Sequence, residues 1–116
     1  MAVLRVVLNI AAGDPAAARA FYGDVLGMAV AMDLGWIVTF ASDAKTPPQL
    51  SIASGGGSGA PVPDISIEVD DFDAVLSRVR AAGIPVEYGP AEEPWGVRRF
   101  FVRDPFGRLV NILDHA

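Results

Sequence analysis

One order of elements occurs twice along this chain of 116 residues: a strand, a helix and then three more strands. In the first half, the apolar and β-branched run Val3–Ile10 leads to Asp14-Pro15, where Asp14 is placed to cap a helix and Pro15 to begin it. In the second half, a similar run over residues 64–69 leads to Asp70-Asp71, which are predicted to cap a helix that reaches Gly83. Because only two copies are present, the pattern predicts a duplicated module rather than a solenoid.

Short strands are predicted to fill the rest of each half. Apolar segments bounded by glycine and proline indicate strands at 29–32, 36–41 and 49–53, and again at 85–88, 97–102 and 109–113. The first helix is expected to end at Leu26-Gly27, and a break is expected at 45–48. The Gly- and Pro-rich segment 55–63 is predicted to be a linker or mobile flap. The chain is therefore expected to be a single domain, with module 1 at about 1–54 and module 2 at about 64–116.

Alternation along the strands predicts which face of the sheet is covered. Val6, Leu8 and Ile10 share one side of the first strand, and uniformly apolar sides of this kind are expected to pack beneath the helices. The opposite sides are mixed in polarity, so they are either solvated or the lining of a cavity. The other residues expected beneath the helices are Leu50, Ile52, Ile65, Ile67, Val69, Phe100, Val102, Val110 and Ile112.

The composition excludes several kinds of site. The chain has no cysteine, which excludes thiolate chemistry and disulfides and is consistent with a cytoplasmic location. Its one histidine, His115, is expected to be a surface residue near a frayed chain end. A net charge of −5 argues against a nucleic-acid partner, and no apolar stretch approaches the roughly 20 residues of a membrane span.

Several segments share their pattern with one known family. In the hairpin Asp104-Pro105-Phe106-Gly107, aspartate and proline begin a tight turn and glycine completes it. The other segments are Asp14-Pro15, Phe21-Tyr22, Val25-Leu26-Gly27, Val69-Asp70-Asp71, Arg80-Ala81-Ala82-Gly83 and the strands within Pro94–Leu113.

Taken together, these segments closely resemble the vicinal oxygen chelate superfamily, which includes glyoxalases, bleomycin resistance proteins and extradiol dioxygenases. The resemblance implies an α+β fold, in which two βαβββ modules in tandem form an open, cup-shaped mixed sheet with the helices outside. It also implies a homodimer that binds ligands in the cup.

The resemblance also allows a test for a metal site. Metal-dependent members carry His, Gln or Glu at four positions, which fall here on Val7, Ser51, Asp64 and Asn111. Valine cannot bind a metal, and a transition metal needs about three strong protein ligands. We therefore expect no metal and no other cofactor.

Without a metal, the cup is expected to recognise its ligand by aromatic and polar side chains. Trp36 and Trp95 are candidates for stacking on a flat heteroaromatic molecule, unless they fill the core or a dimer interface. Arg99 either binds a ligand anion or pairs with Glu68 or Asp64. The full set of predicted ligand-binding residues is Trp36, Phe40, Ser51, Asp64, Glu68, Trp95, Arg99, Phe101 and Asn111.

Two functions remain open at this point. The chain is predicted to be a metal-independent protein that binds a small, antibiotic-like or aromatic molecule, with a role such as antibiotic resistance. The alternative is a glyoxalase- or dioxygenase-like enzyme that uses a weakly bound metal or the carboxylates of Asp64 and Glu68.

Overall fold

The computed structural model describes residues 2–25, 27–43 and 49–115, and it confirms the α+β class and the tandem βαβββ order. The predicted helix end at Leu26 and the predicted break at 45–48 lie outside these residues. No helix within the described part of the chain is long and apolar enough to cross a membrane. The elements are β1 (Val3–Ala11), η1 (Pro15–Ala18), η2 (Arg19–Val25), β2 (Ala29–Asp33), β3 (Ile37–Ala41), β4 (Gln49–Ala53), β5 (Ile65–Val69), α1 (Phe72–Ala81), β6 (Tyr88–Glu92), β7 (Val97–Arg103) and β8 (Leu109–His115).

The chain divides into two compact units. The N-terminal unit comprises Val7–Val62, and the C-terminal unit comprises Pro63–Ala116 together with Met1–Val6. Strand β1 is therefore shared between the units, and each unit is described by itself below.

In the N-terminal unit the strands lie in the order β2-β3-β4-β1. Strand β4 runs parallel to β1 and antiparallel to β3, so this part of the sheet is mixed. The core contains Val38, Phe40 and Ile52, and the ring of Tyr22 from η2 lies 5.7 Å from that of Phe40. Leu50 and Ile52 thus lie on the helix side of the sheet, as predicted.

The first helical segment differs from the expectation in one respect. Pro15 begins it and Asp14 precedes it, but the Asp14 side chain makes no capping hydrogen bond, so the predicted cap is wrong. The segment is a 3₁₀ turn, η1, followed by a π-helix, η2, because its hydrogen bonds do not keep the i to i−4 spacing of an α-helix.

The prediction for β1 was right about facing and wrong about burial. Leu8 pairs with Leu50 and Ile10 with Ile52, so both lie on the helix side of the sheet. However, Val6, Leu8 and Ile10 are 52%, 56% and 43% exposed. Segment η1 packs against β3 and β4, and this stripe of β1 is exposed.

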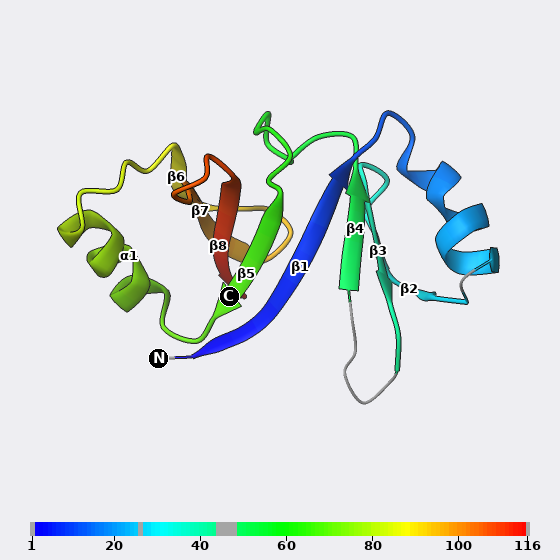
Figure 1. Ribbon diagram of the computed structural model, residues 1–116, viewed down its shortest axis with the longest axis horizontal. Helices are drawn as coiled ribbons and strands as arrows, with labels where there is room; N and C mark the ends of the chain where they lie inside the picture. The colour runs from blue at the N-terminus through cyan, green and yellow to red at the C-terminus, as the bar shows by residue number, and fades with distance from the viewer. Residues whose placement is uncertain (1, 26, 44–48, 116) are drawn as a thin grey trace. The chain divides into compact units, whose positions relative to one another are not determined.

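In the C-terminal unit the strands lie in the order β5-β8-β7-β6, with α1 against one face (Figure 1). Strand β8 runs parallel to β5 and antiparallel to β7. Phe72 of α1 packs edge-on against Phe100, with ring centroids 5.3 Å apart. The predicted helix side is confirmed for Ile67, Val69, Phe100, Val102, Val110 and Ile112.

Charged side chains lie around the first turn of α1. Asp71 caps the helix as predicted, with its carboxylate accepting the Ala74 N–H at 3.1 Å. Asp70 does not cap the helix, because its carboxylate accepts the Ala2 N–H at 2.6 Å instead. Arg98 lies 4.3 Å above the Phe72 ring and donates to Asp114, whose carboxylate raises the pKa of this guanidinium.

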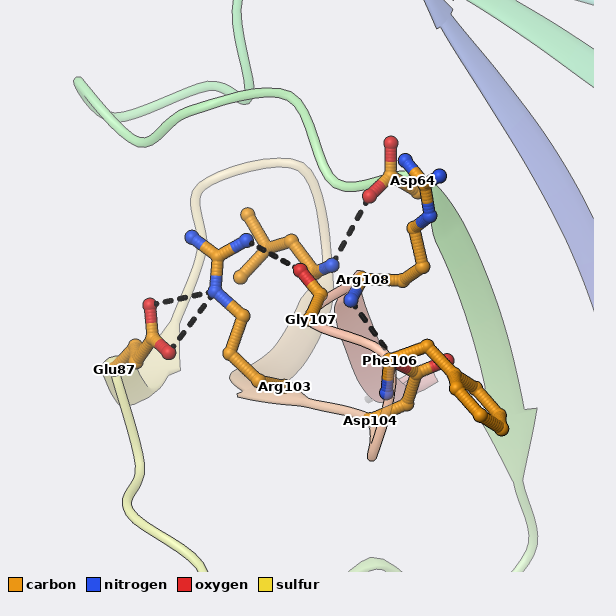
Figure 2. Close-up of polar contacts among 8 residues, drawn as sticks. Asp64, Glu87, Arg103, Asp104, Phe106, Gly107 and Arg108 are labelled. Carbon is orange, nitrogen blue, oxygen red and sulfur yellow. Dashed lines mark hydrogen bonds and ion pairs between the residues drawn. The ribbon is translucent and has the colours of Figure 1, made fainter.

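One connection in this unit follows from turn chemistry, and one strand lies further along the chain than predicted. The Asp104 carboxylate accepts the N–H groups of Phe106 and Arg108, which confirms the predicted hairpin (Figure 2). The strand predicted at 85–88 instead occupies Tyr88–Glu92. This strand, β6, can contain Pro90 because it is an edge strand of the unit, where the missing N–H of proline is tolerated.

The segment 55–63 is ordered by its own backbone. The Gly56 N–H donates to the Ala60 carbonyl at 2.8 Å, and the Ala60 N–H donates to the Gly57 carbonyl at 2.9 Å. The predicted linker is therefore a hydrogen-bonded turn in this structure.

Candidate functional site

The sheet of the C-terminal unit has a second face, opposite α1, that carries polar and aromatic side chains. Successive residues of a strand alternate between faces, so the neighbours of Phe100 and Ile112 point away from the helix. Asn111 lies opposite Phe101 on β7 and opposite Ser66 on β5. We call this side the polar face; its members are Ser66, Glu68, Arg99, Phe101, Asn111 and Leu113.

Arg99 lies at the centre of an aromatic group on this face. Its guanidinium carbon is 5.1 Å from the ring centroid of Tyr88, 5.0 Å from that of Trp95 and 4.9 Å from that of Phe101. Each distance is within the range at which a cation is attracted to an aromatic ring. The structure therefore brings together three of the predicted ligand-binding residues, Trp95, Arg99 and Phe101, and adds Tyr88.

The charge of Arg99 is balanced within the same unit. Its Nη2 is 3.1 Å from Oε2 of Glu93, and the two side chains are only 4% and 3% exposed. Oε1 of Glu93 also accepts the Tyr88 hydroxyl at 2.8 Å. Arg99 thus forms an ion pair, which was one of the two predicted alternatives. Its partner, however, is neither Glu68 nor Asp64.

Asn111 presents an acceptor that nothing in the described chain uses. Its Nδ2 donates to the Ser66 Oγ at 3.2 Å, whereas its Oδ1 is buried and accepts no hydrogen bond from the described residues. A buried acceptor left unsatisfied costs roughly 1–3 kcal/mol. An atom of this kind is suited to accept an N–H or O–H group from a bound molecule.

Asp64 is engaged in holding the sheet together. Its carboxylate accepts the Leu109 N–H at 3.0 Å, and its own N–H donates to the Leu109 carbonyl at 2.9 Å (Figure 2). These two bonds hold the entry to β5 against the start of β8. The carboxylate therefore has a structural partner, which the sequence pattern did not reveal.

Glu68 lies between two positively charged or ionisable groups. One carboxylate oxygen is 3.2 Å from Nε of Arg5 on β1, and the other is 2.6 Å from Nδ1 of His115 on β8. His115 was expected at a frayed chain end, but it is the last residue of β8 and pairs with Val97. The prediction of a frayed end is therefore wrong, although the side chain is 53% exposed.

Trp36, Phe40 and Ser51 belong to the N-terminal unit. Phe40 is wholly buried in the core beneath η2, so its assignment to the ligand-binding face is wrong. Thr39, and not Phe40, is the residue of β3 that lies opposite Ser51, as Phe101 lies opposite Asn111 in the C-terminal unit. The Thr39 and Ser51 hydroxyls hydrogen-bond each other at 2.7 Å, and Trp36 is half-buried just before β3.

The residues at the four family metal positions do not fit a metal ion. Val7 has no donor atom, the Ser51 hydroxyl bonds Thr39, and the Asp64 carboxylate bonds the backbone of β8. Across 2–25, 27–43 and 49–115, no three His, Cys, Asp or Glu side chains cluster in a way that could hold a metal. Asn111, at the fourth position, offers only a neutral amide. The four positions together therefore lack the three strong protein ligands that a transition metal needs.

Sequence reasoning missed Tyr88, Glu93 and the contact of His115 with Glu68. Glu93 follows Glu92 just before the strand predicted at 97–102. A buried arginine such as Arg99 requires a carboxylate nearby to balance its charge. That requirement indicates an acidic partner but does not distinguish Glu93 from Glu68 or Asp64. Only the pairing of β6 with β7 brings Tyr88 opposite Phe101.

Comparison with known proteins agrees with this architecture. The family model described as Glyoxalase/Bleomycin resistance protein/Dioxygenase superfamily matches residues 4–112. No curated protein matches the chain.

Several solved structures share the fold. One is described as an NAD-dependent benzaldehyde dehydrogenase from Legionella pneumophila (TM-score 0.76, 17% identity, covering 97% of this chain and 100% of that one). Another is a methylmalonyl-CoA epimerase from Streptomyces coelicolor (0.73, 20%, covering 99% of each chain). A third is a superfamily member from Vibrio splendidus 12B01 (0.67, 21%, covering 99% of this chain and 100% of that one). Identities this low show a common fold and nothing finer.

Proposed function

We propose a function for this chain on the premise that it belongs to the Glyoxalase/Bleomycin resistance protein/Dioxygenase superfamily. In this proposal the chain binds a small organic molecule against the polar face of the C-terminal unit, without a metal ion. An antibiotic-like ligand, and hence a resistance role, is one form of this function.

The observation that carries the proposal is the buried Oδ1 of Asn111. The amide is held by its bond to Ser66, so the acceptor keeps a fixed direction beside Phe101. A ligand N–H or O–H group that reaches it would recover the free energy that the unsatisfied acceptor now costs. The position is also one at which metal-dependent relatives carry a metal ligand, and an amide is suited to a neutral hydrogen bond there.

The aromatic group supports a flat, unsaturated ligand. Tyr88 and Trp95 are half-buried with Arg99 over both rings, and these are the members that a ligand can reach, whereas Phe101 is wholly buried, 5.0 Å from Tyr88 between ring centroids. Because Glu93 neutralises Arg99, this aromatic group favours an uncharged ring system over an anion. The proposed ligand is thus a flat heteroaromatic molecule that carries a hydrogen-bond donor.

The alternative of a glyoxalase- or dioxygenase-like enzyme has less support. Methylmalonyl-CoA epimerases share the fold, but at 20–21% identity they do not carry their activity to this chain. A metal-dependent reaction is also disfavoured by the donor set, since Val7, Ser51 and Asp64 do not fit a metal ion.

We also propose that the chain works as a homodimer in the cytoplasm. The uncovered apolar stripe of β1, formed by Leu4, Val6, Leu8 and Ile10, is the kind of surface that a second copy covers. Light scattering of the purified protein should give twice the chain mass, and Leu8→Glu should return it to a single chain. A monomer at micromolar concentration would refute the dimer.

The binding proposal is tested by titrating flat heteroaromatic donors while tryptophan fluorescence and heat release are followed. Asn111→Leu removes the acceptor and should weaken the best ligand by about 1–3 kcal/mol, which is roughly 5- to 150-fold. Ser66→Ala keeps the acceptor but frees the amide, so its loss should be smaller than that of Asn111→Leu. Equal losses in the two variants, or affinity that disappears with EDTA, would contradict the proposal.

A further inference from the structure

The last strand ends in a histidine that a carboxylate holds in place. His115 Nδ1 lies 2.6 Å from Oε2 of Glu68, and the second oxygen of Glu68 lies 3.2 Å from Nε of Arg5. The Glu68 side chain is 19% exposed, whereas that of His115 is 53% exposed. The carboxylate is thus anchored from both sides, and the imidazole is accessible.

This contact determines which ring nitrogen of His115 is available. A carboxylate only accepts hydrogen bonds, so the proton of a neutral imidazole is carried on Nδ1, where it is donated to Glu68. Nε2 then has its lone pair free to take a proton from another molecule. An imidazole oriented by a carboxylate through Nδ1 is a general-base arrangement.

His115 lies on the polar face, because it pairs with Val97 and follows Leu113 by two residues along β8. A hollow of about 380 Å³ lies at this end of β7 and β8, but it is lined by other residues, namely Glu92, Glu93, Gly96, Val97, Arg98 and Asp114. The charged groups nearest to the imidazole on the neighbouring strands are Glu68 and Arg5, and the next on β7 is Arg99, which Glu93 neutralises.

From this geometry we propose that the chain has a metal-free proton-transfer activity toward flat heteroaromatic C–H acids, with His115 as the catalytic base and Glu68 as its positioning residue. The class of substrate rests on the proposed function, whereas the proton transfer itself depends on His115 and Glu68 and not on Asn111. In the reaction, Nε2 takes the proton from an acidic ring carbon, and the electrons of that C–H bond form a new multiple bond as the leaving group departs with its own electron pair. The imidazolium then returns the proton to water, so no oxidant, reductant or second substrate is needed.

A suitable probe is 5-nitrobenzisoxazole, in which removal of the ring proton breaks the N–O bond and releases a coloured phenolate. The full chain in EDTA should exceed an equal concentration of free imidazole by about tenfold or more. His115→Gln should reduce the rate to that of buffer, and added imidazole should restore part of it. Glu68→Gln should lose roughly tenfold or more.

The matched control is Glu87→Gln, the same substitution in another carboxylate that holds an arginine Nε, that of Arg103 (Figure 2). Its rate should equal that of the unmodified chain. A His115→Gln rate equal to that of the unmodified chain would overturn the proposal, as would a rate abolished by EDTA.

Because the chain has one histidine, its tautomer can be read directly from imidazole ¹⁵N shifts. The Nδ1–H form should dominate in the unmodified chain and give way to the Nε2–H form in Glu68→Gln. This readout separates positioning from loss of structure, since circular dichroism should be the same for both proteins. A tautomer unaffected by Glu68→Gln would refute the positioning role.

Discussion

The ion pair between Arg99 and Glu93 allows a sharp test of how the aromatic group is held. In Glu93→Gln the shape of the side chain is kept, and the Gln oxygen can still accept the Tyr88 hydroxyl that now bonds Glu93 at 2.8 Å. The substitution therefore removes one charge and replaces Oε2, the acceptor for Arg99, by an amide NH₂. It leaves the Arg99 guanidinium buried among three rings without its counter-ion.

The expected cost follows from burial. The side chains of Arg99 and Glu93 are 4% and 3% exposed, and removal of one partner from a buried pair costs about 3–5 kcal/mol. The pair between Arg103 and Glu87 has a similar separation, 3.0 Å, but its side chains are 47% and 41% exposed. Glu87→Gln should therefore cost less than about 1 kcal/mol.

Urea unfolding followed by circular dichroism measures the difference. With a slope of about 2 kcal/mol per molar urea, Glu93→Gln should lower the unfolding midpoint by roughly 2 M. The double variant Glu93→Gln with Arg99→Met has no buried charge and should recover most of that loss. If Glu93→Gln were as mild as Glu87→Gln, the reasoning about burial would be refuted.

Three further predictions concern local structure. Asp71→Ala removes the cap of α1 and should cost about 1 kcal/mol in the free energy of unfolding, as measured by urea. The N–H of Gly35 holds the pKa of Asp33 below its ordinary value of 3.8. Ionised Asp33 therefore stabilises the fold above that pH, and this contribution is lost as the pH falls through the lowered pKa. In an acid titration, the free energy of unfolding of Asp33→Asn should lack this part of the decrease. Gly89→Ala should disturb β6 and lower the melting temperature, because an added Cβ would lie 2.5 Å from the carbonyl oxygen of Arg99.

Each of these predictions has its own check. Asp14→Ala is the matched control for the helix cap, because Asp14 precedes η1 without a side-chain hydrogen bond, and its effect should be small. An acid titration of Asp33→Asn that matches the unmodified chain would contradict the pKa argument. Gly13→Ala, where an added Cβ meets no atom within 4 Å, should be far milder than Gly89→Ala.

Much of the fold was predictable because it rests on local rules. Asp71 begins a helix and Asp104 begins a hairpin through bonds to backbone atoms a few residues away, so their positions in the sequence suffice. Alternation along β7 correctly predicted that Phe100 and Phe101 face opposite sides of the sheet. The unsuitability of Val7 for a metal likewise follows from residue type alone.

The facing of Phe40 shows where local rules stop. Strand parity has a period of two, so an error of one residue in the expected register reverses the facing of every side chain in the strand. Thr39 and Phe40 are both compatible with a strand, and only the pairing of β3 with β4 shows that Phe40 is the one beneath η2.

The sequence by itself determined the tandem order of elements, the hairpin and the poor suitability of Val7, Ser51 and Asn111 as metal ligands, since these depend on residue type and near neighbours. The tertiary structure decided which charges meet. Glu93 rather than Glu68 neutralises Arg99, and Glu68 instead orients His115. The physical reason is that an ion pair requires two side chains within about 4 Å, a distance set by strand register and not by separation along the chain.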